Sequence, residues 1–201
     1  MNFLSIDCST DIGSLFLKIE NKTFSKILQS DKYSNDLLMK QILDFFEENA
    51  LNLNSVSQIF VNQGPGNFSG LRGSLATAKG ISLSKNINLS GYNTFIWLCG
   101  KFLKKKDSIF CFIKFREKYF LKEFKNNFKN ISKIKEVSED EIVKKYKGKF
   151  KIVPKNLIKY FDKRILKIND INIVELDHNV LESLQLRGLL EEKTIKPLYL
   201  T

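Results

Sequence analysis

The sequence predicts an α/β fold in two lobes, and two observations carry that prediction. Short apolar segments typical of buried strands alternate with segments of helical periodicity before residue 104. The lysine run Lys104–Lys106 then marks a change in composition. We therefore expect an N-terminal lobe over residues 1–103 and a smaller C-terminal lobe over residues 104–201, whose last helix packs back on the first lobe.

The first lobe begins with a predicted three-stranded meander. Residues 2–8, 13–20 and 23–29 have the apolar content and turn residues of short strands. A helix capped by Asp31 or Ser34 should follow and run to about Asn49, because one of its sides is apolar and the other charged. The remaining elements are a strand at 58–62, a helix from Ser69 to about Lys85, a strand at 88–91 and a helix from Thr94 to about Leu103.

The second lobe is less regular in its pattern. Residues 109–115 and 118–124 predict a hairpin, and Ser138 begins a capping box for a short helix. A last helix is expected from Asp177 to Leu190. Together, the two lobes make an α/β protein with no repeat and no low-complexity tail.

Composition excludes several classes of protein. No apolar run approaches the ~20 residues that cross a bilayer, and an aspartate follows the first residues too early for a signal peptide, so we expect a cytoplasmic protein without membrane contact. The three cysteines lie far apart in apolar stretches, which predicts reduced thiols. Because His178 is the only histidine, a His-paired nucleophile or metal pair is not expected, and we predict neither a metal nor another cofactor.

Positive charge is concentrated in the middle of the chain. Residues 101–167 carry 22 basic and 8 acidic side chains. One interpretation is a surface that contacts tRNA through its phosphates. The other is a solvated lysine-rich face without a ligand, since phosphate clamps favour arginine over lysine.

Two short motifs could carry chemistry. Asp7, Ser9 and Thr10 follow the first strand in a tight turn, where they could meet a phosphate and its metal or simply close the turn. A glycine-rich loop joins a strand to a helix, where free N–H groups could hold an anion or the loop could be a rigid turn. It matches no common phosphate-loop pattern. Its candidate residues are Gly64, Pro65, Gly66, Ser69, Gly70 and Arg72.

These motifs carry a resemblance to a known family. The segments 6–10, 64–72 and 75–80, with the closing 195–200, resemble the TsaB (YeaZ) family, closely before residue 99 and thinly beyond it. The resemblance implies an actin-like fold (the ASKHA, sugar kinase and RNase H-like class), with two lobes and a mixed sheet in each. It also implies a non-catalytic partner of the transferase TsaD and the ATPase TsaE in making N6-threonylcarbamoyladenosine in tRNA, and a homodimer when isolated. Asp7, Ser9 and Thr10 would then be a degenerate phosphate hairpin.

In this family two N-terminal helices pair with TsaD. We assign that interface to seven residues, with the alternative that one apolar stripe packs only on its own sheet: Leu38, Met39, Ile42, Phe46, Leu75, Ala76 and Lys79. The chain departs from the family pattern at four positions where other residues are common, and no contact is carried over to them: Tyr33, Gln63, Gly73 and Lys114.

Two further functions stay open from the residues themselves. A small actin-like phosphotransferase would use Asp7 and Thr10 with magnesium and ATP, although the second lobe has no adenosine-type glycine motif. A tRNA-binding module would use residues 101–167. A peptidase is not expected, because the chain lacks a His-based nucleophile and a metal site.

Overall fold

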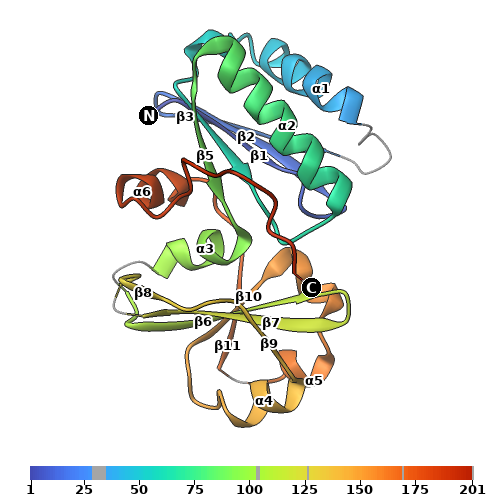
Figure 1. Cartoon of the computed structure of the whole chain (residues 1–201), viewed down its shortest axis with the longest axis vertical. Helices are drawn as coiled ribbons and strands as arrows, with labels where there is room; N and C mark the ends of the chain where they lie inside the picture. The colour runs from blue at the N-terminus through green and yellow to red at the C-terminus, as the bar shows by residue number, and fades with distance from the viewer. Residues whose placement is uncertain (29–34, 103–104, 126, 169, 201) are drawn as a thin grey trace. The chain divides into compact units, whose positions relative to one another are not determined.

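The computed structural model describes residues 1–28, 35–102, 105–125, 127–168 and 170–200 (Figure 1). These residues form two compact units, residues 1–94 with 181–201 and residues 95–180. The first unit thus ends before the lysine run and includes the C-terminal segment. The two cap candidates Asp31 and Ser34 and the departure at Tyr33 lie outside the described residues, as does Lys104.

The first unit contains a five-stranded sheet in the order β3-β2-β1-β4-β5. β1 pairs with β2 in antiparallel and with β4 in parallel orientation, and β5 is parallel to β4. Because β1 and β4 are central, all their residues are buried. The strands are β1 (Phe3–Asp7), β2 (Gly13–Ile19), β3 (Lys22–Leu28), β4 (Gln58–Asn62) and β5 (Asn88–Tyr92).

Two helices pack together over this sheet, α1 (Asn35–Glu48) and α2 (Phe68–Lys85) (Figure 1). A 3-10 turn, η2 (Leu53–Ser55), connects α1 to β4. The side chain of Asn67 caps the start of α2 by accepting a hydrogen bond from the Ser69 N–H, and Asn86 ends the helix in the left-handed region. One core joins both helices to strands β1, β2 and β4.

The second unit contains a six-stranded mixed sheet in the order β11-β10-β6-β7-β8, with β9 also paired to β7. β6 and β7 form the predicted hairpin, while β10 is parallel to β6 and β11. The prediction of an α/β fold with a mixed sheet in each unit is therefore confirmed. The strands are β6 (Ser108–Phe115), β7 (Lys118–Lys125), β8 (Asn130–Ile131), β9 (Lys135–Val137), β10 (Lys151–Pro154) and β11 (Ile171–Val174).

The remaining helices of the chain are short. The predicted capping box is present at α4, where Ser138 and Glu141 exchange hydrogen bonds between side chain and backbone. The last helix is shorter than predicted, because Gly188 adopts a positive φ soon after its final turn. The helices are α3 (Thr94–Cys99), η3 (Gly100–Phe102), α4 (Glu139–Lys144), η4 (Lys155–Tyr160), α5 (Lys163–Leu166) and α6 (Val180–Leu186).

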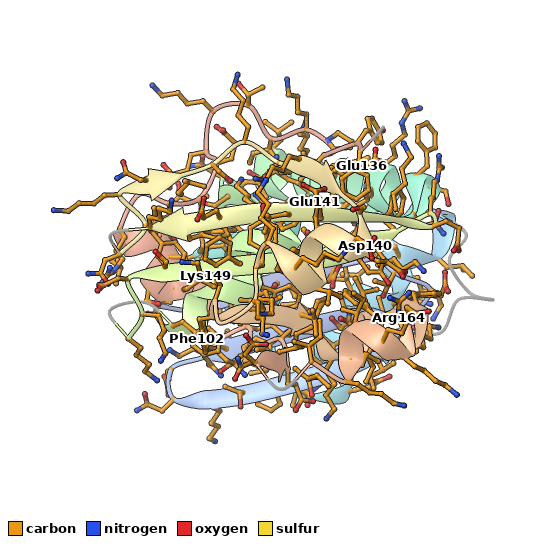
Figure 2. The ribbon with its side chains drawn as sticks, turned by 90° about the horizontal axis from the view of Figure 1, so that it is seen from below. Phe102, Glu136, Asp140, Glu141, Lys149 and Arg164 are labelled. Atoms are coloured by element: carbon orange, nitrogen blue, oxygen red, sulfur yellow. The ribbon has the colours of Figure 1, made fainter. Side chains whose placement is uncertain are left out.

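Charged side chains of both signs cover the second unit, among them Asp140, Glu141, Lys149 and Arg164 (Figure 2). Lys144 pairs with Asp140, and Lys145 pairs with Glu141. Some of the excess basic charge of residues 101–167 is thus offset locally by acidic neighbours. Contact with tRNA through these residues stays a prediction.

Candidate functional site

A buried polar cluster lies where β1 and β4 end. The Asp7 carboxylate accepts hydrogen bonds from the Ser9 backbone N–H (2.9 Å) and the Asn62 side-chain amide (3.0 Å). The same Asn62 nitrogen lies 3.2 Å from the hydroxyls of Ser9 and Thr94. Burial raises the pKa of Asp7. Both of these hydrogen bonds end on Asp7 Oδ1, and only 4% of Asp7 is exposed.

Of the three predicted hairpin residues, the structure brings together two. Ser9 joins Asp7 in the buried cluster, whereas the Thr10 hydroxyl donates to the Ile12 carbonyl 2.7 Å away and closes the turn. The sequence did not predict that Asn62 and Thr94 would belong to this cluster. The signal that could have identified Asn62 is a polar residue at the end of a largely apolar strand, two residues before a glycine. The Asn62 side chain accepts a hydrogen bond from the Gly64 N–H.

The glycine-rich loop packs directly on the turn after β1. The Asn67 N–H donates to the Ser9 carbonyl oxygen at 2.8 Å. A Cβ atom added to Gly66 would lie 1.9 Å from that same oxygen, and one added to Gly70 would lie 2.3 Å from the Cys8 carbonyl oxygen. These two glycines are therefore required for close backbone approach. The geometry favours the rigid-turn interpretation, and Pro65 is buried within it.

The C-terminal segment crosses this loop. The side chain of Gln63 donates to the Lys196 carbonyl, and the Leu198 N–H donates to the Gln63 carbonyl. At the start of α2 the ring of Tyr199 stacks on Phe68, with 5.5 Å between ring centroids. Arg72 covers the same Phe68 ring, and its Nε donates to the Tyr199 hydroxyl at 3.1 Å. Gln63 and Arg72 thus hold the end of the chain.

The seven predicted interface residues divide between core and surface. In α1 the side chains of Leu38, Ile42 and Phe46 are buried in the core, and Met39 is partly buried against it. In α2 Leu75 is also buried there. Ala76 and Lys79 are exposed. The alternative of packing on the chain's own sheet therefore describes five of the seven positions.

A different set of residues is exposed on the same helices. Ala76, Lys79, Gly80 and Leu83 recur at helical spacing along the outer side of α2, and we call these four residues the α2 stripe. Leu83 is 84% exposed, and no atom lies within 4 Å of a Cβ added to Gly80. On α1, Leu37 and Leu43 are also exposed, at 40% and 48%. Within the described part of the chain, these apolar groups are left facing solvent.

Part of this chain matches a known family model and a named relative. Residues 26–111 match the family model "TsaD: tRNA N6-adenosine threonylcarbamoyltransferase". The chain is 34% identical over 86 residues to the tRNA threonylcarbamoyladenosine biosynthesis protein TsaB of Buchnera aphidicola subsp. Baizongia pistaciae, an alignment that covers 42% of this chain and 38% of that relative. The matched region spans well under half the length of that relative.

Two solved structures are similar over the whole chain. YeaZ from Pseudomonas aeruginosa has a TM-score of 0.71 at 14% identity and 99% coverage of both chains. A second structure, of a protein with similarity to peptidase YeaZ from Pseudomonas aeruginosa, has a TM-score of 0.73 at 14% identity, with coverage of 100% of this chain and 99% of the other. At 14% identity, these two matches show that the chain shares its fold with YeaZ.

Two departures from the TsaB/YeaZ pattern, Gly73 and Lys114, have the following surroundings. Gly73 is buried in α2. Lys114 lies on β6 beside the hairpin turn, where its ammonium is 3.5 Å from the Glu117 carboxylate and 5.2 Å from the centroid of the Tyr119 ring. Arg116 and Glu117 form that turn with positive φ. Lys114 therefore stabilises a hairpin of the second unit.

The single histidine is structural in its surroundings. The His178 ring packs against Trp97 with 4.6 Å between centroids, and the Trp97 indole N–H donates to the Asp177 carbonyl. Burial lowers the pKa of His178 to about 4.

No group of three His, Cys, Asp or Glu side chains that could hold a metal ion is found among the described residues. No helix in the described part of the chain is both long and apolar enough to span a bilayer.

The lowered pKa makes the stability of the second unit depend on pH. Above pH 6.5 His178 is neutral in both folded and unfolded chains, so its contribution is fully present there. Between pH 6.5 and about 4 the unfolded chain binds a proton that the folded chain does not, so stability falls with falling pH by up to about 3 kcal/mol. Denaturant unfolding followed by Trp97 fluorescence measures this, and His178→Asn should flatten the slope. An equal slope in both proteins would contradict the assignment.

Proposed function

We propose that the chain is a non-catalytic partner subunit in the synthesis of N6-threonylcarbamoyladenosine in tRNA. In this proposal it pairs with a TsaD-family transferase and works alongside the ATPase TsaE. The resemblance of the motifs to the TsaB (YeaZ) family and the name of the Buchnera relative support the pathway, and the match to the TsaD family model supports a partner built on a related fold.

The observation that carries the pairing is the α2 stripe. Ala76 has a small side chain and Gly80 has none, so another helix could approach this side of α2 closely. The Leu83 side chain, which is 84% exposed, would supply an apolar contact. Ala76 and Lys79 are the two originally predicted interface residues that remain available for contact. We propose that the stripe binds TsaD in the complex and a second copy of this chain when the protein is isolated.

The burial of the Asp7 cluster supports the non-catalytic role. A phosphotransferase would need Asp7 and Thr10 to face a metal-bound phosphate together. Instead Asp7 is buried under hydrogen bonds from its own chain, and Thr10 is turned to the Ile12 carbonyl. The glycine-rich loop places Gly66 and Gly70 against the backbone that such a phosphate would approach. This arrangement favours the partner role over the phosphotransferase.

Binding to the TsaD homologue from the same genome tests the pairing. The two proteins, purified separately and mixed, should elute together in gel filtration and give a one-to-one stoichiometry by light scattering. Failure to associate at micromolar concentrations would overturn the proposal. Addition of a noncognate actin-like protein, which should elute separately, controls for unspecific association of the apolar surface.

A further inference from the structure

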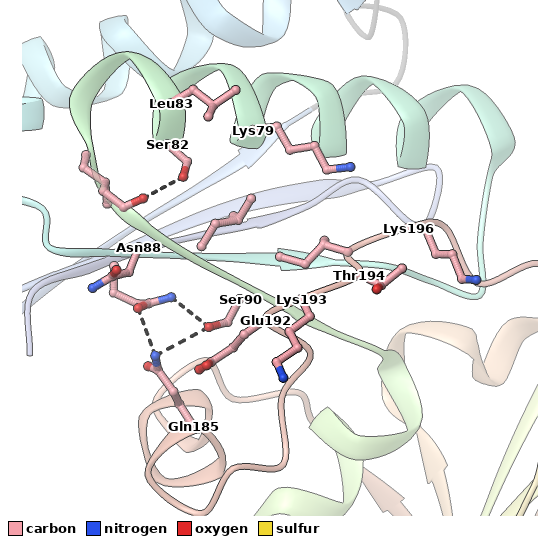
Figure 3. Close-up of a pocket in the computed structure, with 14 residues that line it drawn as sticks. Lys79, Ser82, Leu83, Asn88, Ser90, Gln185, Glu192, Lys193, Thr194 and Lys196 are labelled. Atoms are coloured by element: carbon pink, nitrogen blue, oxygen red, sulfur yellow. Dashed lines mark hydrogen bonds between the residues drawn. The ribbon is translucent and has the colours of Figure 1, made fainter.

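A groove with a volume of ≈ 900 Å³ lies beside the open edge of the first unit's sheet (Figure 3). Lys79 and Leu83 of α2 form one wall, and the C-terminal residues 192–196 form another. Leu89 and Ser90 of β5 line it between these walls. We call this cavity the β5 groove. Two members of the α2 stripe therefore also line the groove.

β5 is the last strand of its sheet, and its outer edge is only partly covered. Gly91 forms an antiparallel bridge with Glu191, donating its N–H to the Glu191 carbonyl (2.7 Å) and accepting from the Glu191 N–H (2.9 Å). Residues two apart in a strand direct their N–H and C=O groups the same way, so those of Leu89 also point outward. Within the described residues no hydrogen bond occupies these outward groups of Leu89.

A second acceptor without a partner lies at one end of the groove. The side-chain nitrogen of Gln185 donates to the Gln58 side chain at 2.9 Å, and Gln58 in turn donates to the Ser90 hydroxyl at 3.0 Å (Figure 3). The Gln185 Oε1 atom is buried with no hydrogen-bond partner. A buried polar atom in this state is costly unless a ligand supplies a donor.

The groove is also positively charged. Lys79, Lys193 and Lys196 line it, against the single acidic residue Glu192. None of these three lysines forms an ion pair in the part of the chain that the structure describes. Figure 3 shows Lys79 on α2 and Lys196 on the C-terminal segment, so the charge comes from opposite walls. An acidic ligand is the complementary occupant.

We propose that the β5 groove binds an extended acidic segment of the partner subunit, which adds to the sheet at Leu89. An extended chain supplies the N–H and C=O that the edge of β5 lacks, and acidic side chains would pair with the lysines. The inference rests on the proposed function, because the groove continues from the α2 stripe through Lys79 and Leu83. A partner docked on the stripe would hold such a segment beside the groove.

Titration of the full chain with the TsaD homologue, at low and high salt, tests the charge. Replacing Lys193→Glu together with Lys196→Glu should weaken binding about tenfold or more and reduce its dependence on salt. Lys85→Glu is the matched control, since Lys85 is exposed on α2 but does not line the groove. It should bind within about twofold of the wild type, because a rim charge away from the contact contributes little.

Hydrogen exchange tests the backbone pairing. The Leu89 amide should exchange much more slowly in the complex than in the free chain. Leu89→Pro removes this outward N–H, together with a side chain that packs partly against the core, and should weaken binding; proline is tolerated on an edge strand where the N–H faces away from the sheet. Leu89→Ala, which keeps the N–H, is the control for the lost side chain and should bind more tightly than Leu89→Pro. If Leu89→Pro does not fold, the exchange of the wild-type amide decides.

The outcomes separate this inference from the proposed function. Wild-type binding that persists in the double lysine variant, with unchanged Leu89 exchange, overturns the groove and leaves the pairing intact. No binding by the wild type overturns both. Groove variants that alter only self-association of this chain also overturn the inference, because the occupant would then be a second copy.

Discussion

Gly66→Ala is expected to destabilise the first unit by at least about 3 kcal/mol. The added Cβ would lie 1.9 Å from the Ser9 carbonyl oxygen, a distance that no rotamer can relieve. The loop must then move away, which breaks the hydrogen bond from the Asn67 N–H to that oxygen. Hydrogen exchange of the β1 and β4 amides, with denaturant unfolding, measures the loss.

The control for this change is Gly80→Ala. Gly80 lies in the interior of α2 with no atom near a Cβ, so alanine should stabilise the helix by about 0.5–1 kcal/mol. Opposite signs at the two glycines would confirm that close backbone approach, and not helix or loop propensity, fixes Gly66. Equal and small effects at both positions would show that the loop does not pack on the turn after β1.

Ala76→Glu should weaken binding to the TsaD homologue about a hundredfold or more while leaving the fold intact. The residue is exposed in the free chain, so a carboxylate there remains solvated. In a helix-to-helix contact the same carboxylate would be buried without a partner. Equilibrium binding and the thermal unfolding midpoint of the free variant are the two measurements.

Lys85→Glu serves again as the matched variant, because at 3.6 residues per turn Lys85 lies on the side of α2 opposite Ala76. It should change neither binding nor the unfolding midpoint appreciably. Wild-type affinity in Ala76→Glu would contradict the assignment of the α2 stripe to the interface, even if the complex forms by another surface.

The order of elements in the first unit could be predicted from the sequence because each strand there is a short apolar run between turn residues. The choice of interface residues could not. Leu38, Ile42 and Phe46 were assigned to a partner because α1 has a broad apolar side, and a helical wheel does not show which part of that side its own sheet covers. The exposed part proved to be Leu37 and Leu43.

The buried cluster shows a different limit of sequence reasoning. Asp7 and Ser9 are two residues apart in sequence and were predicted together, but Asn62 and Thr94 reach them only because β1, β4 and β5 are neighbours in the sheet. Similarly, the β5 groove joins Lys79 to residues 193 and 196, a proximity that depends on how the C-terminal segment runs past α2. Contacts between distant segments carry no local pattern.

Reconstitution of threonylcarbamoyl transfer to tRNA tests the central claim most directly. The assay compares this chain alone, the cognate TsaD and TsaE homologues without it, and all three together, with modified adenosine measured after digestion of the tRNA. We predict no product from the chain alone and full activity from the three proteins, lost again with Ala76→Glu. Product from this chain alone, or full activity without it, would contradict a non-catalytic partner that is required for the reaction.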